Sequence, residues 1–197
     1  GNIPDSKTVK HLLEDLDLLG FGKTKFVMDR GFYSEENING LYCEHVKFLV
    51  GTRLSLKFIK KNLDDVYDDI RMFNNYDDSI ATYGYTVSTE WDYIQERPYK
   101  GDTIRDKRRM YIHYYYSVEK GADDEQAFDK RIACLHKELL ENKMVESHKK
   151  AYEQFFEVKN TPKRGRQVNY KEDAIKEARK YLGYFALITN EKMDAFT

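Results

Sequence analysis

An alternation of helical and extended segments in the first 53 residues most constrains what this chain can fold into. Residues 5–19 carry leucines and a valine at the i, i+3, i+4, i+7 spacing of an amphipathic helix. Phe26–Asp29 is apolar and extended, Ser34 can cap a second helix, and Val46–Val50 forms a second apolar run. This order predicts an α/β arrangement in which the two strands are parallel and joined by a right-handed crossover.

Asp29 is the first candidate functional residue, because it ends the earlier strand and is followed by the turn residues Arg30 and Gly31. A carboxylate at the end of a central strand, beside a glycine turn, is a position where α/β enzymes place a metal ligand. An aspartate that only caps the turn fits the same residues equally well. The local pattern therefore leaves both interpretations open.

The middle of the chain changes character. Residues 60–78 hold six Asp against three basic residues and predict a solvated helix end or a loop, with no chemistry assigned. Tyr83–Val87 and Glu90–Gln95 alternate aromatic or β-branched residues with polar ones, which predicts two strands. Met110–Tyr116 is the strongest strand signal here, and its tyrosines suit the face of a sheet.

The last third of the chain returns to helical spacing. Residues 123–143 place apolar side chains on one face, and residues 144–157 continue or repeat that helix. Asn169, with Glu172 three positions later, fits a variant capping box that would open another helix. Residues 184–189 are apolar enough for a strand that is buried on both faces.

Basic residues gather in two places although the net charge is only −1, from 33 basic and 34 acidic residues. Residues 97–109 carry six basic side chains against two acidic ones, and residues 159–171, predicted to be a loop, carry five basic side chains and no acid. Such clusters can hold phosphates by charge alone, or can be ordinary solvated surface. The overall charge excludes only a wholly basic nucleic-acid binder.

Other sequence features exclude several classes of protein. Cys43 and Cys134 lie far apart and match no zinc or redox spacing. No apolar run approaches the length of about 18 residues that a membrane span needs, and no secretory signal is visible. Because the chain begins with Gly rather than Met, we expect it to be a piece of something longer.

Three stretches resemble motifs of one family. Gly1–Thr8 resembles a Gly-Asn-x-x-Asp-Ser-x-Thr motif, Val27–Asn37 resembles an Asp-Arg-Gly-Phe-x-Ser-x-Glu-Asn block, and Gly183–Asn190 resembles a strand that returns from an inserted domain. These are motifs of the DDE-type insertion-sequence transposases of bacteria. The resemblance implies an α/β fold (α+β overall), in which a partial ribonuclease H-like core is interrupted by an α+β insertion with a Tyr-rich antiparallel sheet and helices.

The resemblance also implies a chemistry. Three carboxylates hold two Mg²⁺ or Mn²⁺ ions, which activate water and later a DNA 3′-hydroxyl for attack on phosphodiesters. Asp29 would be the second acid. The first Asp would precede Gly1, and the Glu would follow the chain in a Tyr-x-x-Arg-x-x-x-Glu pattern that is absent here, since Glu191 comes too early. We therefore expect this fragment alone to bind no metal and to be inactive.

The implied organisation is a core segment over residues 1–53, an inserted domain over 54–168, and a returning helix and strand over 169–197. The expected partner is double-stranded DNA at transposon ends, with a possible homodimer through exposed sheet edges. The expected location is the bacterial cytoplasm, at the nucleoid, and not a membrane. Candidate DNA contacts are Arg30, Arg105, Lys107, Arg108, Arg109, Lys163, Arg164 and Arg166.

Two other functions fit the residues. A truncated or domesticated transposase piece could serve as a non-catalytic module that binds DNA or protein. An unrelated α/β hydrolase or phosphatase could use Asp29 as its nucleophile, although the chain lacks the supporting motifs.

Overall fold

The computed structural model describes Val9, residues 24–97, residues 99–161 and residues 165–197. The chain divides into two compact units: residues 1–116 together with 185–197, and residues 117–184. The helix predicted over residues 5–19 lies outside the described residues except for Val9, which is helical and buried.

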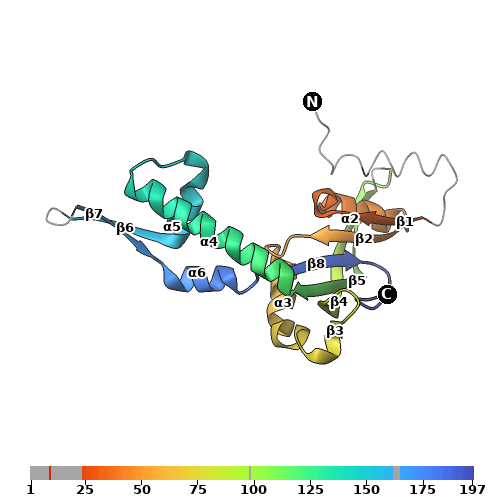
Figure 1. Ribbon diagram of the computed structural model, residues 1–197. Helices are drawn as coiled ribbons and strands as arrows, with labels where there is room; N and C mark the ends of the chain where they lie inside the picture. The colour runs from red at the N-terminus through yellow and green to blue at the C-terminus, as the bar shows by residue number, and fades with distance from the viewer. Residues whose placement is uncertain (1–8, 10–23, 98, 162–164) are drawn as a thin grey trace. The chain divides into compact units, whose positions relative to one another are not determined.

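The first unit is built on one mixed sheet (Figure 1). The first two strands are parallel, with Phe26 opposite Phe48, and the returning strand is antiparallel to the second. The predicted parallel pair and the return of residues 184–189 to its side are therefore confirmed. In spatial order the strands are β1 (Lys25–Met28), β2 (Lys47–Thr52), β8 (Tyr184–Thr189), β5 (Asp102–Ser117), β4 (Thr82–Arg97) and β3 (Tyr76–Asp77).

Two helices cover one face of this sheet, α2 (Glu35–Cys43) and α3 (Lys57–Ile70). The predicted cap of α2 is confirmed, since the Ser34 hydroxyl accepts a hydrogen bond from the Asn37 amide at 3.1 Å. The acidic stretch beginning at residue 60 is mostly helix, because Ile59, Leu63 and Ile70 bury one side of α3 while its aspartates remain at the surface.

Trp91 shows that both helices lie on the same face of the sheet. Its indole nitrogen donates to the Asn39 side chain of α2 at 2.8 Å, and its ring meets the Phe58 ring of α3 edge-on at 5.7 Å. Tyr114 on β5 points the same way, because its hydroxyl donates to the Ile59 carbonyl of α3 at 2.7 Å. Short 3₁₀ turns, η1 (Arg30–Phe32) and η2 (Phe73–Asn75), flank these helices.

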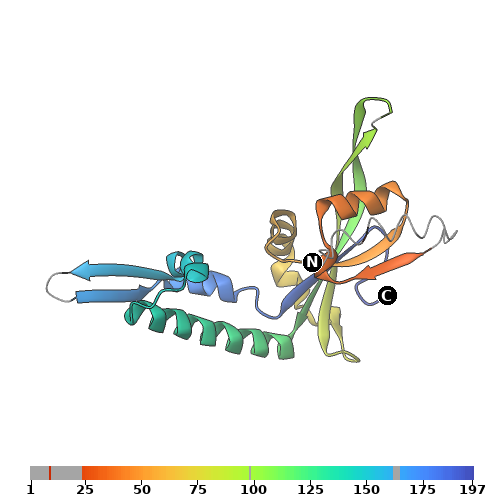
Figure 2. The ribbon, with the colours of Figure 1, turned by 90° about the horizontal axis from the view of Figure 1, so that it is seen from above.

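A long hairpin of β4 and β5, 16 residues in each strand, extends past the end of α2 (Figure 2). The two strands predicted within β4 are one continuous strand. The basic cluster of residues 105–109 lies within β5, although the sequence predicted a strand there only from Met110 onward. Alternating periodicity is hidden there because charged residues occupy both faces, and pairing with β4 supplies the hydrogen bonds that maintain the strand.

Cross-strand contacts keep one register along this hairpin. Arg97 pairs with Asp102 near the turn, Lys107 pairs with Asp92 further along, and Thr86 bonds to His113 at 2.9 Å near the body of the sheet. Alternate residues of β5 therefore keep to one face throughout its length.

The face opposite the two helices is partly covered by the last residues of the chain. Tyr115 stacks on Phe185 at 4.9 Å, and its hydroxyl donates to the Ala195 carbonyl at 2.5 Å. His113 also lies on this face and is only 1% exposed, so it is a core residue. Burial lowers the pKa of its imidazole.

The second unit has its own core, formed by α4 (Val118–Leu140), α5 (Lys149–Phe155) and α6 (Glu172–Arg179) with the hairpin of β6 (Phe156–Thr161) and β7 (Gly165–Tyr170). A 3₁₀ turn, η3 (Glu146–His148), precedes α5. The buried side chains at the centre include Ile132, Leu135, Leu139, Tyr152, Phe155 and Ile175.

Several local predictions for this unit were wrong. Within the predicted loop of residues 159–171, residues 159–161 and 165–170 belong to the paired strands β6 and β7. Asn169 lies in β7 opposite Glu157 and does not cap α6, which begins at Glu172 after Lys171. The segment was predicted to be a loop because it is basic and contains glycine. A two-stranded hairpin that meets a core on only one side needs few apolar residues, so its strands lack the apolar pattern that would reveal them.

The observed units differ from the predicted segments 1–53, 54–168 and 169–197. The Tyr-rich hairpin belongs to the first unit because β5 hydrogen-bonds to β8 in the same sheet. The second compact unit is therefore confined to residues 117–184. How these units correspond to core and insertion stays a prediction.

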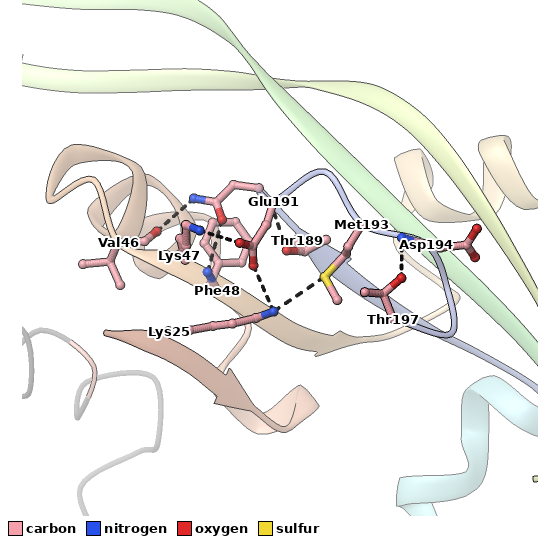
Figure 3. A network of polar contacts seen from close by, with 10 residues as sticks. Lys25, Val46, Lys47, Phe48, Thr189, Glu191, Met193, Asp194 and Thr197 are labelled. Atoms are coloured by element: carbon pink, nitrogen blue, oxygen red, sulfur yellow. Dashed lines mark hydrogen bonds and ion pairs between the residues drawn. The ribbon is translucent and has the colours of Figure 1, made fainter. Parts of the chain in front are cut away.

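A polar network fastens β1, β2 and the residues after β8 to one another (Figure 3). Glu191 forms ion pairs with Lys25 at 2.9 Å and with Lys47 at 2.5 Å. The Asn190 side chain accepts from the Phe48 amide at 3.1 Å and donates to the Val46 carbonyl at 2.9 Å. The network thereby holds the starts of β1 and β2 beside the end of β8, at one end of the sheet.

This network makes stability depend on acid pH. Hydrogen bonds from Lys47 and then Lys25 lower the pKa of Glu191 below its ordinary value of 4.5. A lowered carboxyl pKa adds stability that is complete above about pH 4.5 and is lost as the pH falls through the folded-state pKa. We expect Glu191→Gln to reduce the urea midpoint at pH 7 and to have less effect near pH 3. Glu90→Gln, an exposed residue of β4, is the control; an equal loss at both pH values for Glu191→Gln would contradict the prediction.

Candidate functional site

Asp29 lies directly after β1 and caps the η1 turn. Its carboxylate Oδ1 accepts a hydrogen bond from the Gly31 amide at 2.6 Å, and its carbonyl accepts from the Phe32 amide at 3.2 Å. The residue is exposed. Asp29 is therefore confirmed as a cap of the turn. This role is compatible with Asp29 as a metal ligand, because the cap fixes the direction of a carboxylate that solvent can reach.

β1 is the outermost strand of the sheet among the described residues, rather than a central one. Our description of Asp29 as the end of a central strand does not hold for this part of the chain. The open edge expected for the fragment is present along β1 in the described residues, and Val27 at its middle is 74% exposed.

Gly51 of β2 supports the Asp29 turn, and sequence reasoning missed it. A Cβ atom built on Gly51 would lie 2.8 Å from the Arg30 nitrogen and 3.3 Å from the Asp29 carbonyl carbon. Only a residue without a side chain lets the turn rest this closely on the neighbouring strand. A glycine inside an otherwise apolar strand was the available signal, because it often marks a close backbone approach.

Glu191 lies at the opposite end of β1 from Asp29. It contacts Lys25, which begins β1, and Lys47, the residue paired with Lys25 on β2. Four residues of extended chain separate Lys25 from Asp29, a length of about 13 Å. Glu191 therefore cannot share a metal ion with Asp29, which agrees with its exclusion on sequence grounds.

Within the described part of the chain, no three His, Cys, Asp or Glu side chains come together in an arrangement that could hold a metal ion. Asp29 offers the hard oxygen ligand that Mg²⁺ or Mn²⁺ prefers, but a single carboxylate is a small part of such a site. Its role as a metal ligand stays a prediction.

The basic cluster on the β4–β5 hairpin divides into paired and unpaired side chains. Lys107 pairs with Asp92, and Arg108 lies 3.4 Å from Asp106 and 4.9 Å above the Tyr93 ring centre. Arg105 and Arg109 are exposed, and neither forms an ion pair with a described residue.

Arg105, Lys107 and Arg109 alternate along β5 and so project from one face. We call these three residues the β5 basic row. Arg108 projects from the other face, where it contacts Tyr93. The row therefore presents two guanidinium groups with no acidic partner in the described chain, and one ammonium group whose partner is exposed.

The other candidate basic residues are placed differently. Lys163 and Arg164 lie outside the described residues. Arg166, on β7, donates to the Asn142 side chain, which follows α4. Arg166 therefore connects two parts of the second unit. Arg30 is exposed within η1.

Comparison with protein families gives the class of the chain. The model of the transposase DDE domain family matches residues 1–193, and the chain belongs to this family. The mixed sheet with its helices is consistent with the α+β, ribonuclease H-like fold of such transposases. No curated protein and no solved structure gives a significant match. No helix in the described ranges combines the length and apolarity that crossing a membrane requires.

Gly51→Ala should disturb the Asp29 turn. The added methyl group meets backbone atoms that cannot rotate away, so we expect a loss of about 1–3 kcal/mol in the free energy of unfolding, as in other overpacked sites. The Gly31 amide signal should also shift in an NMR spectrum, because Gly31 donates to Asp29.

Gly84→Ala is the matched control. Its methyl group would meet side-chain atoms of Phe196 and Ala195. These side chains can move aside because they lie near the end of the described chain. We expect a smaller loss of stability and an unchanged Gly31 signal. An unchanged Gly31 signal in Gly51→Ala as well would show that Gly51 does not position the turn.

Proposed function

We propose that this chain forms part of a transposase that cuts transposon-end DNA and joins it to a target, with Asp29 as one of the metal-binding carboxylates. The family match over residues 1–193 carries the proposal. The exposed carboxylate at the end of β1, held by the Gly31 amide and backed by Gly51, supports the assignment of Asp29.

Bound Mg²⁺ or Mn²⁺ would supply the activation of water, and later of a DNA 3′-hydroxyl, in phosphodiester cleavage and strand transfer. The task of Asp29 is to provide an oxygen ligand in a fixed direction. Because Mg²⁺ is usually held by one or two carboxylates together with substrate phosphates and waters, further acids must complete the site. We propose that this chain alone does not cleave DNA.

The β5 basic row and the basic residues of the β6–β7 hairpin are the proposed contacts to double-stranded DNA, at transposon ends in the bacterial nucleoid. Phosphate binding needs positive groups whose charge is not already neutralised. Arg105 and Arg109 satisfy that condition best among the described candidates, whereas Arg166 donates to Asn142 within its own unit. A homodimer through the exposed β1 edge fits this role.

A non-catalytic module that binds DNA or protein is the second candidate. The lack of a three-ligand metal group among the described residues is expected for either function, because the proposed metal site needs acids from outside this chain. The two functions differ in one measurable property, cleavage that depends on Asp29.

Asp29→Ala in the complete transposase should abolish nicking of a supercoiled plasmid in Mn²⁺. We expect a fall of at least about a hundredfold, because metal stabilisation of the transition state is worth several kcal/mol. Glu191→Gln, at the other end of β1, should keep its activity. Wild-type nicking by Asp29→Ala would refute the assignment of Asp29, and nicking by the 197-residue chain alone would refute its proposed inactivity.

Arg105→Ala combined with Arg109→Ala should weaken DNA binding by this chain in a salt-dependent manner. Each lost phosphate contact lowers the slope of log affinity against log salt by about 0.9, so we expect the slope to fall by about 2. Arg108→Ala is the matched control, because Arg108 already faces Asp106 and Tyr93. Fluorescence anisotropy with a 20-base-pair duplex measures both; equal slopes for the double variant and wild type would rule out the row as a phosphate contact.

A further inference from the structure

We infer that duplex DNA lies obliquely over one face of the sheet, outside the last residues of the chain that cover Tyr115 there, with the β5 basic row holding phosphates about six to nine base pairs from the phosphate at Asp29. The inference rests on the proposed function, since it takes Asp29 as the point of cleavage. It goes further by placing the hairpin on internal DNA rather than on the reacting end.

The directions of the strands place Asp29 and the row at opposite ends of the sheet. β1 and β2 run parallel toward Asp29, and β8 runs the other way. β5 lies beside β8, with Tyr115 stacked on Phe185, and Ser117 donates to the Gly183 carbonyl at 3.1 Å. Higher residue numbers on β5 therefore face lower numbers on β8, so β5 also runs toward the Asp29 end.

The row thus lies near and beyond the end marked by Lys25 and Glu191. Continuing the β5–β8 pairing brings Arg109 level with Glu191, and Arg105 lies four residues further out. An independent contact agrees with this placement. Tyr42, in the last turn of α2, donates to the Arg109 carbonyl at 2.8 Å, and α2 begins beside the Asp29 turn and ends at the other side.

The row and the Asp29 turn share one face of the sheet. The hairpin keeps a single register, so the row projects from the same side as Tyr111, His113 and Tyr115. Tyr115 stacks on Phe185, and Leu187 lies on the same side of β8 two residues later, paired with Gly51. A Cβ atom on Gly51 would point at the Asp29–Arg30 backbone, so the turn lies over this face.

The spacing follows from strand geometry. Asp29 and Arg109 differ by four residues along the strands and by three strand-to-strand steps across them, which gives about 20 Å; Arg105 is about 30 Å away. Duplex DNA rises about 3.4 Å per base pair, so these distances correspond to about six to nine base pairs.

The chemistry of the face fits duplex DNA as its occupant. Residues i and i+2 of a strand lie about 7 Å apart, so the row presents positive charge at regular intervals to a polyanion. Contacts to phosphates position a duplex without reading its sequence. Arg105 and Arg109 can supply such contacts because neither pairs with an acid in the described chain.

Two photo-crosslinking residues in one chain test this path. p-Benzoylphenylalanine is introduced at Val27, next to Asp29, and at Ile94, opposite Arg105; both positions are exposed on this face, at 74% and 40%. They lie about 28 Å apart, or about eight base pairs along DNA. We expect doubly linked complexes with a 20-base-pair duplex, and linked nucleotides about eight base pairs apart within each complex.

The control chain carries the reagent at Val27 and Phe73. Phe73 is 80% exposed but stacks on Tyr76, which lies on the side of the sheet that the helices cover. It should give no doubly linked product. Crosslinks at Ile94 alone would overturn the inferred path while leaving DNA binding by the hairpin intact. An equal yield of double links from the control would overturn it as well. Loss of nicking in Asp29→Ala tests the proposed function separately.

Discussion

The unbroken register of the β4–β5 hairpin determines which of its side chains share a face of the sheet. Ion pairs and a Thr86–His113 hydrogen bond follow it from the turn to the body of the sheet. A single bulge would exchange the faces of all residues beyond it. Because these three contacts fit one register, the exposed arginines at one end and the buried Tyr115 at the other belong to the same face.

The two ends of β1 have different roles in the fold. At the first end, Glu191 and Asn190 join three strands by charge and by hydrogen bonds. At the other end, the Asp29 turn is held by its own cap and by contact with a glycine backbone. At the first end one carboxylate is paired with two ammonium groups, whereas the carboxylate at the second end remains accessible. Separating the ion-pair network from the candidate ligand by about 13 Å prevents Lys25 and Lys47 from neutralising Asp29.

The sequence predicted the elements whose signals are local. The strand before Asp29, the Ser34 cap and the strand over residues 184–189 depend on short apolar runs and one capping residue, and the structure confirms them, although Phe185 and Leu187 are only half-buried. It did not predict the outer part of β5, because charges on both faces remove the period of two. It also failed at Asn169, where pairing with Glu157 prevailed over a local capping pattern.

Gly51 could not be assigned a role from the sequence, because the atoms that exclude a side chain there belong to residues about 20 positions earlier. The same limit applies to the basic cluster. Its sequence shows six cations near two acids, but which cations are neutralised depends on cross-strand neighbours such as Asp92. A net charge of −1 is therefore compatible with the proposed DNA contacts, since phosphate binding would depend on unpaired guanidinium groups such as those of Arg105 and Arg109 and not on the total charge.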